Sequence, residues 1–295
     1  MQFRLLNDRK IRAKRNIFLL APLLALALLV AAVPVRAATT PDPALLASTY
    51  SHEETLTYEI SWLGLTAGRL VIHLVPETAA TDRYAIRVTA RTAGMLDVFY
   101  PVEDHFETVV EGGSRLPSRY KVDQHEGSRR KQKLTLYDQH GGVITYRRND
   151  EPAIVYTVAG PTYNEFSAFM IMRALPMTVG NEVVVPTFAD EKRHEVKVAV
   201  EKEETVASLI GKVACLRVRP HLNFKGLYTK MGDPLVWLSN DRERLPLLIK
   251  AKIAIGSLTA RLVERRRGPK GRAAELTAPA PQPPADTDSG EEWSQ

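Results

Sequence analysis

The sequence predicts a mainly β protein, built as an antiparallel curved sheet or as an open barrel or sandwich, with one central helix. Apolar and polar side chains alternate through most of the chain, as at Leu56, Tyr58 and Ile60, and a period of two is typical of strands that bury one face. Turn-forming pairs such as Gly112-Gly113 and Gly141-Gly142 separate these segments. Because strands follow strands without regular alternation with helices, antiparallel pairing is favoured.

One helix interrupts the expected strands near the middle of the chain. Large apolar side chains at helical spacing predict it over residues 163–173, and Asn164 or Ser167 is suited to cap its start. Pro176 lies beyond its end and prevents its continuation. The strands are expected around residues 55–62, 70–74, 84–90, 105–111, 119–124, 131–137, 143–147, 153–158, 181–188, 195–201, 212–219, 235–238, 247–255 and 258–263.

The first 37 residues have the three parts of a secretory signal peptide. A basic stretch over residues 9–15 precedes an apolar run over residues 17–35, and Val35-Arg36-Ala37 offers the small residues that a signal peptidase recognises. We expect cleavage after Ala37 and a periplasmic mature protein. An uncleaved inner-membrane anchor is the alternative, because about 17–25 apolar residues span a bilayer.

The remaining chain divides into a spacer over residues 38–49, a β-rich domain over residues 50–264 and a tail over residues 265–295. The tail is rich in proline and charge, so we expect it to be disordered. The whole chain has 40 basic and 34 acidic residues; residues 1–37 hold seven of the former and one of the latter, which leaves 33 of each. The mature protein is neutral, and the electrostatic case for a nucleic-acid partner disappears.

Several short motifs occur in a fixed order along the chain. They are Leu-Thr-Tyr-Glu-Ile-Ser-Trp-Leu-Gly-Leu-Thr-Ala-Gly over residues 56–68, Phe-Ser-Ala-Phe over residues 166–169 with Arg173, Val-Trp-Leu-Ser-Asn-Asp over residues 236–241, and Ile-Gly-Ser-Leu-Thr over residues 255–259. In order and spacing they resemble the bacterial domain of unknown function 3108 family over about residues 50–263. The resemblance implies a secreted, mainly β protein of the Gram-negative envelope, and it supplies no reaction.

One position departs from the pattern of that family. Where the family commonly has an acid and a proline ahead of the helix serine, this chain has Asn164-Glu165-Phe166. The resemblance therefore implies that Glu165 carries any role that the acid has.

The sequence favours a protein that is not an enzyme and that uses no metal or cofactor. The seven histidines form no metal-binding pair, and Cys215, the single cysteine, lies in an expected strand as a buried, inert thiol. No Gly-x-Ser-x-Gly motif frames Ser167, Ser239 or Ser257, so a hydrolase is the least favoured interpretation. Asp104-His105 followed by Glu107 is explained by exposed strand positions, because neighbouring residues of a strand point to opposite faces.

The function favoured by the sequence is the binding of a lipid-like ligand or of another envelope component, with a protein-interaction or scaffold module as the alternative. Curved sheets in exported proteins often hold apolar ligands, and two segments, residues 93–101 and 222–231, place large apolar groups between strands. We expect no nucleic-acid partner, and contact with a membrane only through the signal segment if it is uncleaved. The candidate binding residues are Trp62, Phe99, Tyr100, Phe169, Arg173, Phe224, Tyr228, Trp237 and Asp241.

Overall fold

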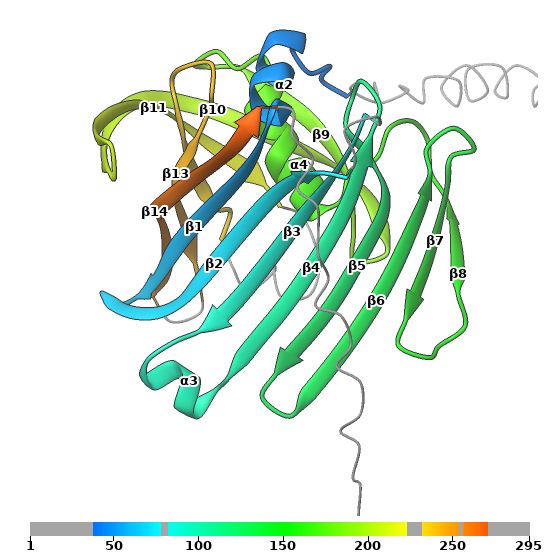
Figure 1. Cartoon of the computed structure of the whole chain (residues 1–295). Coiled ribbons are helices and arrows are strands. Elements are labelled where there is room, and N and C mark those ends of the chain that lie inside the picture. The colour runs from blue at the N-terminus through cyan, green and yellow to red at the C-terminus, as the bar shows by residue number, and fades with distance from the viewer. Residues whose placement is uncertain (1–37, 78–81, 223–231, 254–255, 271–295) are drawn as a thin grey trace, which may run out of the picture. The chain divides into compact units, whose positions relative to one another are not determined.

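Fourteen antiparallel strands form one strongly curved sheet in the computed structural model, which describes residues 38–77, 82–222, 232–253 and 256–270 (Figure 1). The predicted signal peptide lies outside the described residues. The strands are β1 (His52–Trp62), β2 (Leu65–Pro76), β3 (Arg83–Thr92), β4 (Val102–Glu111), β5 (Leu116–Glu126), β6 (Arg129–Asp138), β7 (Val143–Arg148), β8 (Ile154–Thr157), β9 (Glu182–Ala189), β10 (Lys192–Ser208), β11 (Gly211–His221), β12 (Leu235–Ser239), β13 (Pro246–Lys252) and β14 (Ser257–Lys270).

The sheet consists of two meanders that meet at the first and last strands. Across the sheet the order is β8-β7-β6-β5-β4-β3-β2-β1-β14-β13-β12-β11-β10-β9, so every pair is consecutive in sequence except β1 with β14. The helix α4 (Glu165–Ile171) lies on the connection between the two meanders. Because β8 and β9 remain edges, the sheet is curved but not closed. The prediction of an antiparallel curved sheet with a central helix is confirmed.

The central helix is shorter than predicted and is capped by Asn164. The Asn164 Oδ1 accepts hydrogen bonds from the backbone N–H groups of Phe166 and Ser167, and the Ser167 hydroxyl accepts one from the backbone N–H of Asn164. This reciprocal capping box fixes the first turn. After Ile171 the chain tightens into the 3₁₀ helix η1 (Met172–Ala174).

Two further helices were not predicted. The spacer contains α2 (Pro43–Tyr50), which begins at Asp42, whose side chain accepts hydrogen bonds from two backbone N–H groups. Pro43 is suited to the first helical position because the proline ring already has a helical φ. A short helix, α3 (Met95–Phe99), lies between β3 and β4. Residues 43–49 are therefore a folded part of the domain and not a spacer.

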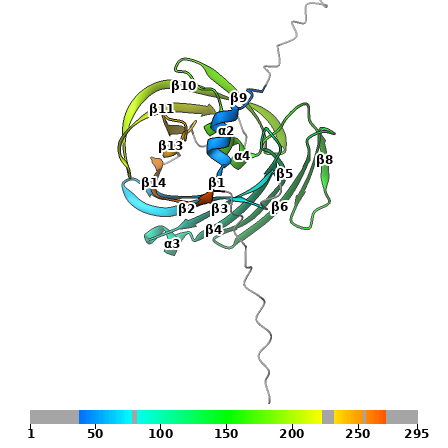
Figure 2. The same cartoon turned by 45° about the horizontal axis from the view of Figure 1, so that its top comes forward.

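Helices α2 and α4 lie inside the curve of the sheet (Figure 2). Leu46 and Tyr50 of α2, with Met170 and Ile171 of α4, are buried in one cluster with apolar side chains from both meanders, including Leu238. The concave face is therefore filled by the protein's own side chains where these helices pack. The buried Cys215 belongs to the same cluster, as predicted.

The start of the predicted tail is a strand. β14 continues to Lys270, and its residues 265–270 pair with β1 between His52 and Leu56. Composition alone suggested disorder here because the segment is rich in arginine. Two of these arginines, Arg265 and Arg267, form ion pairs with Glu54 and Glu243, which offset the cost of ordering the segment.

The two edges of the sheet differ. Other segments cover β9: the N–H of Thr39 donates to the carbonyl of Val184 at 2.9 Å, and Tyr163 forms a parallel bridge with Thr187. Among the described residues no strand covers β8, where Ile154 and Val155 are exposed. An uncovered edge strand with apolar side chains is a site at which another chain can add.

Candidate functional site

The most deeply buried charges hold η1 against the joint of the two meanders. Arg173 is 0% exposed, and its Nη1 donates to Glu54 Oε2 at 2.6 Å. Its Nε and Nη2 donate to the carbonyl oxygen of Glu243 at 3.2 and 3.1 Å. From β14, Arg265 Nε donates to Glu54 Oε1 at 2.8 Å. The network therefore ties η1, β1, β14 and the β12–β13 turn together.

The charges of this network compensate one another. Burial by itself would raise the pKa of Glu54, but the guanidinium groups of Arg173 and Arg265 outweigh burial and hold that pKa below its ordinary value. Glu54 is therefore ionised at neutral pH. Since Arg173 has no exposed surface, its visible role is to support the fold.

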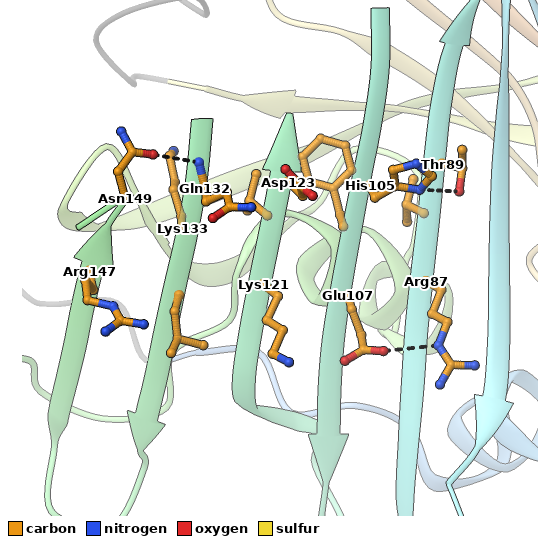
Figure 3. Close-up of a pocket in the computed structure, with 14 residues that line it drawn as sticks. Arg87, Thr89, His105, Glu107, Lys121, Asp123, Gln132, Lys133, Arg147 and Asn149 are labelled. Atoms are coloured by element: carbon orange, nitrogen blue, oxygen red, sulfur yellow. Dashed lines mark hydrogen bonds and ion pairs between the residues drawn. The ribbon is translucent and has the colours of Figure 1, made fainter. Parts of the chain in front are cut away.

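A polar trough of about 560 Å³ crosses β3 to β7 on the face that points away from the core (Figure 3). On β3, Arg87 and Thr89 of the trough alternate with the core residues Ile86 and Val88. Figure 3 shows polar side chains in two rows across the strands: Arg87, Glu107, Lys121 and Arg147 in one, and Thr89, His105, Asp123, Gln132 and Asn149 in the other. We call this surface the outer trough.

Many charges of the outer trough are paired within it or beside it. Glu107 accepts hydrogen bonds from Arg87 Nε at 3.1 Å and from Arg119 Nη2 at 3.0 Å, and Asp123 lies 3.3 Å from His125 Nε2. Exposed ion pairs of this kind contribute little stability and need no ligand to explain them. Asp104, on the opposite face, is buried and accepts from Gln124 and from the His125 N–H. The strand assignment of Asp104, His105 and Glu107 holds, but the expected exposure is wrong for Asp104, which is buried on the face opposite His105.

A second hollow, of about 210 Å³, lies on the inner face beside the start of α4, and we call it the inner pocket. Strands β5, β6 and β7, Glu165 of α4 and the β9–β10 turn surround it. Its ionisable lining consists of three basic side chains, three acids and three tyrosines: Lys131, Lys133, Arg148, Glu165, Asp190, Glu191, Tyr120, Tyr137 and Tyr146. It differs from the outer trough because an acid is buried within it.

Glu165 is that acid. Its Oε2 is buried and accepts no hydrogen bond from the described residues. Burial raises the pKa of Glu165 above its ordinary value, and Asp190 adds to the rise, while Lys133 and a hydrogen bond involving Tyr120 oppose it. A buried carboxyl with a perturbed pKa in a pocket marks a candidate functional site.

Replacing Glu165 by glutamine is expected to increase stability at neutral pH. A carboxyl whose pKa is raised in the folded protein destabilises it when ionised, so the wild type loses stability as the pH rises from about 4.5 through the raised pKa. Glu165→Gln removes that loss, and its advantage in urea unfolding should grow over this pH window and then level off. The exposed Glu59→Gln is the control. An advantage of Glu165→Gln that is the same at every pH contradicts the expectation.

A patch of exposed apolar side chains lies at one end of the sheet, and we call it the apolar tip. It comprises the β1–β2 turn and α3: Leu63, Leu65, Met95, Val98, Phe99 and Tyr100, which are 64%, 72%, 74%, 79%, 77% and 45% exposed. The two parts are adjacent, because the N–H of Ala93 donates to the carbonyl of Ala67 at 3.0 Å. On the other side, the N–H of Gly127 donates to the Pro101 carbonyl at 2.7 Å, which holds the β5–β6 turn beside Tyr100.

Leu63 occupies an unfavourable backbone conformation in this tip. Leu63 and Gly64 have φ of 51° and 84°, the left-handed values of a two-residue hairpin turn. Such turns favour Asn, Asp or Gly, and the left-handed conformation costs other L-residues about 1–2 kcal/mol. The turn therefore presents an exposed leucine at a cost in stability, which suggests that the apolar side chain has a use.

The sequence-predicted binding residues fall into separate places. Trp62, Phe99 and Tyr100 lie at or beside the apolar tip, since Trp62 ends β1 just before Leu63. Phe169 of α4 packs against the core, while Phe224 and Tyr228 lie outside the described residues.

The remaining two predicted residues make contacts within the protein. Trp237 is buried and donates from Nε1 to Glu204 Oε1 at 2.7 Å. Asp241 is exposed and accepts from the Ser239 hydroxyl and from the backbone N–H groups of Glu243 and Arg244, as a turn residue does. Together with Arg173, these residues do not share a surface with the apolar tip.

Two of the three serines considered for catalysis, Ser167 and Ser239, form structural hydrogen bonds. Ser167 caps α4, and the Ser239 hydroxyl donates to Asp241 while accepting from the Leu245 N–H. In the described part of the chain, no serine, histidine and acid form one connected chain of hydrogen bonds. Burial raises the pKa of the Cys215 thiol to about 11, so the thiolate is scarce at neutral pH.

The described residues hold neither a cluster suited to a metal ion nor a helix suited to a membrane span. No group of three or more His, Cys, Asp or Glu side chains is placed to hold a metal ion within the ranges that the structure describes. Over the same ranges, none of the helices has the length and apolar character needed to span a bilayer.

The inner pocket and the exposed Leu63 were missed by sequence reasoning. Lys131 and Lys133 share one face of β6, and this alternation is visible in the sequence. The proximity of Glu165 and Arg148 depends on how strands and helix pack, which local patterns do not show. The leucine before Gly64 was a usable signal, because that position of a tight turn disfavours it.

The architecture defines an open, barrel-like, mainly antiparallel β protein. A solved structure with this fold is described as a β-barrel-like protein of domain of unknown function DUF1849 from Brucella abortus; it is 12% identical, with a TM-score of 0.50, over 74% of this chain and 98% of that one. A search of curated proteins gave no match. Residues 57–263 match the family described as "Protein of unknown function (DUF3108)". The chain belongs to the DUF3108 family, as its motifs suggested.

Proposed function

We propose that this chain is an exported, non-enzymatic periplasmic protein that docks on a lipid bilayer surface through the apolar tip. The observation that carries the proposal is the grouping of six exposed apolar side chains on the β1–β2 turn and the adjacent α3. Contiguous exposed apolar surface on a soluble domain commonly marks an interaction site. The secretory signal over residues 1–37 supports the location.

The charges around the apolar tip fit a lipid surface that carries negative charge. Arg129 and Arg130, the first two residues of β6, are exposed next to the β5–β6 turn and form no ion pair with the described residues. The nearby acids are engaged: Asp97 accepts from the Thr92 hydroxyl, and Glu103 is paired with Arg91. Apolar side chains flanked by free arginines are typical of surfaces that bind anionic lipid.

The packing of the inner face favours contact with the bilayer surface over the enclosure of a lipid chain. The concave face holds α2 and α4, and neither hollow described above is lined mainly by apolar side chains. An enclosed acyl chain therefore has less support than contact at the surface. The proposal extends the expectation from sequence, which limited membrane contact to the signal segment.

The mature chain should co-sediment with vesicles of phosphatidylcholine and phosphatidylglycerol, and the triple variant Leu65→Ser, Val98→Ser, Phe99→Ser should bind at least about 100-fold more weakly. Each buried side chain of this size contributes about 1.5–3 kcal/mol, and three of them account for the loss. Binding to pure phosphatidylcholine vesicles should be weaker than to the mixture, because the arginines then have no anionic partner.

Matched variants separate docking from general loss of apolar surface. Val179, Leu209 and Ile210 are also exposed, so changing these three to serine should leave vesicle binding unchanged. Leu63→Asn should weaken binding while stabilising the protein by about 1 kcal/mol, because asparagine suits the left-handed turn. Equal binding by the two triple variants, or no binding by the wild type, would exclude the proposal.

The uncovered edge of β8 favours a second candidate function, recruitment of a protein partner by strand addition. Ile154 and Val155 are exposed on that edge, and its backbone groups are free to pair with another strand. Val155→Pro would prevent a partner from pairing there without touching the apolar tip. Loss of a co-purifying envelope protein from Val155→Pro alone would favour this function over lipid docking.

A further inference from the structure

Three basic side chains converge on the inner pocket. Lys133 lies directly opposite Arg148 in the β6–β7 pairing, and Lys131 is two residues from Lys133 on the same face of β6. Side chains directly opposite one another on neighbouring strands lie about 4.5–5.5 Å apart at Cβ, and like charges in such pairs repel. The fold therefore gathers positive charge on one wall of a hollow.

Three acids, Glu165, Asp190 and Glu191, also line the pocket, and none of them forms an ion pair with the three cations among the described residues. Arg148 is held by Glu151, whose Oε1 lies 3.2 Å from its Nε and 3.0 Å from its Nη2. Lys131 and Lys133 form no ion pair with the described residues. Burial lowers the pKa of Lys131, and Lys133 and Arg148 lower it further, while Glu126 opposes the fall. A repulsion of this kind is relieved when an anion binds between the cations.

The pocket also contains a buried group that can serve a bound anion. Glu165 Oε2 reaches the pocket from the start of α4 without a hydrogen-bond partner among the described residues. Burial raises the pKa of Glu165, and in its protonated form a carboxyl donates a hydrogen bond to an anion instead of repelling it. The pocket thus offers lysine donors on β6, a guanidinium on β7 and a carboxyl on α4.

We infer that the inner pocket binds a small oxyanion group of the phosphate type, with Lys131, Lys133 and Arg148 as cationic contacts and the Glu165 carboxyl beside them. Lysine and arginine are the usual side-chain partners of phosphate in proteins. The hollow of about 210 Å³ admits a phosphate group but is small for a drug-sized ligand.

The route to the pocket starts at the apolar tip. Arg129, Lys131 and Lys133 occupy alternate positions of β6, so they lie on one face from the β5–β6 turn to the pocket. The phosphate group therefore has two chemical sources, a free phosphate compound or a phospholipid headgroup. Only the second source rests on the proposed docking at a bilayer.

Titration calorimetry of the mature chain tests the inference with three probes at matched ionic strength: inorganic phosphate, sulfate and soluble dihexanoyl phosphatidic acid. Saturable binding of the inorganic anions indicates that the natural ligand is a free phosphate compound. Binding of the short-chain lipid alone indicates that it is a phospholipid headgroup. In either case Lys131→Ala with Lys133→Ala should weaken binding at least about tenfold, because two charge-assisted hydrogen bonds are lost.

The control pair Lys197→Ala with Lys212→Ala makes the same change in net charge at exposed lysines of β10 and β11, and it should bind as the wild type does. The inference is overturned if both double variants lose the same affinity for the probes, or if no probe binds saturably. The Leu65→Ser, Val98→Ser, Phe99→Ser variant should keep its affinity for soluble probes, so failure of tip docking and failure of this pocket are distinguishable.

Sulfate, whose charge is constant over the range, reports the protonation of Glu165. Affinity should rise as the pH falls towards and through the raised pKa of Glu165, and Glu165→Gln should bind with a flatter pH profile. The other ionisable groups around the pocket are Lys131, Lys133, Arg148, Asp190 and Glu191, with the tyrosines Tyr120, Tyr137 and Tyr146. An unchanged pH profile in Glu165→Gln removes the carboxyl from the proposed site.

Discussion

Replacing Arg173 by methionine is expected to lower the free energy of unfolding by about 3–5 kcal/mol. The substitution leaves the Glu54 carboxylate, which is 3% exposed, without its 2.6 Å partner, and it removes both donors to the Glu243 carbonyl. Urea unfolding at neutral pH followed by circular dichroism measures the loss. Removing one member of a buried ion pair costs more than the pair contributes, because the remaining charge stays desolvated.

Two comparisons make this expectation specific to the buried network. Arg266→Met removes an arginine of β14 that is 70% exposed at its side chain, and it should change stability by less than about 0.5 kcal/mol. The double variant Arg173→Met, Glu54→Leu should recover much of the loss, since no unpaired carboxylate remains. If Arg173→Met is as stable as Arg266→Met, the structural role given to Arg173 is contradicted.

Acid provides an independent measurement of the same network. The pKa of Glu54 is lowered in the folded protein, so the stabilisation is present above the unfolded value of about 4.5 and is lost as the pH falls through the lower folded value. In Arg173→Met the main cause of that lowering is absent. The variant should therefore show a smaller loss of stability on acidification than the wild type.

Replacing Tyr50 by alanine is expected to cost about 3–5 kcal/mol, the range for large aromatic side chains removed from a core. Tyr50 ends α2 and is 1% exposed. Its ring meets that of Tyr84 edge-on, with centroids 5.2 Å apart, and the Arg115 guanidinium lies 5.3 Å from its centroid. Thermal and urea unfolding of Tyr50→Ala measure the cost.

The matched control is Tyr50→Phe. The Tyr50 hydroxyl is buried and has no hydrogen-bond partner among the described residues, so its removal should change stability by less than about 1 kcal/mol in either direction. If Tyr50→Ala is as mild as Tyr50→Phe, then α2 is not an integral part of the core.

The strands could be predicted from sequence because their information is local. Alternation such as that of Leu56 and Tyr58 identifies a strand that buries one face, and the family motifs supported the same assignment. The helix α2 was missed although Asp42-Pro43 is a helix-start signal, since eight residues with little amphipathic pattern resemble a linker. Residues 265–270 were missed because their ordering depends on Glu54, far away in sequence.

For the candidate sites, too, local features could be predicted from sequence and contacts between distant residues could not. The aromatic residues Phe99 and Tyr100 stood out between strands, and they proved to lie at the apolar tip. The inner pocket was not predicted, because Lys133 and Glu165 come together only when α4 packs against β4 and β9. Sequence reasoning noticed Glu165 through the departure from the family's pattern, and only the structure shows that its carboxyl oxygen is buried beside lysines.

The pairing of β1 with β14 has a consequence for how the chain folds. Each meander consists of neighbours in sequence, so its hairpins form from nearby segments. The joint, in contrast, brings His52 beside Lys270 and closes a loop that contains nearly the whole domain. The slow step of folding is therefore expected to be the union of two preformed halves. While a ribosome or a translocation channel still holds β14, this strand cannot pair with β1. The two meanders then remain unjoined.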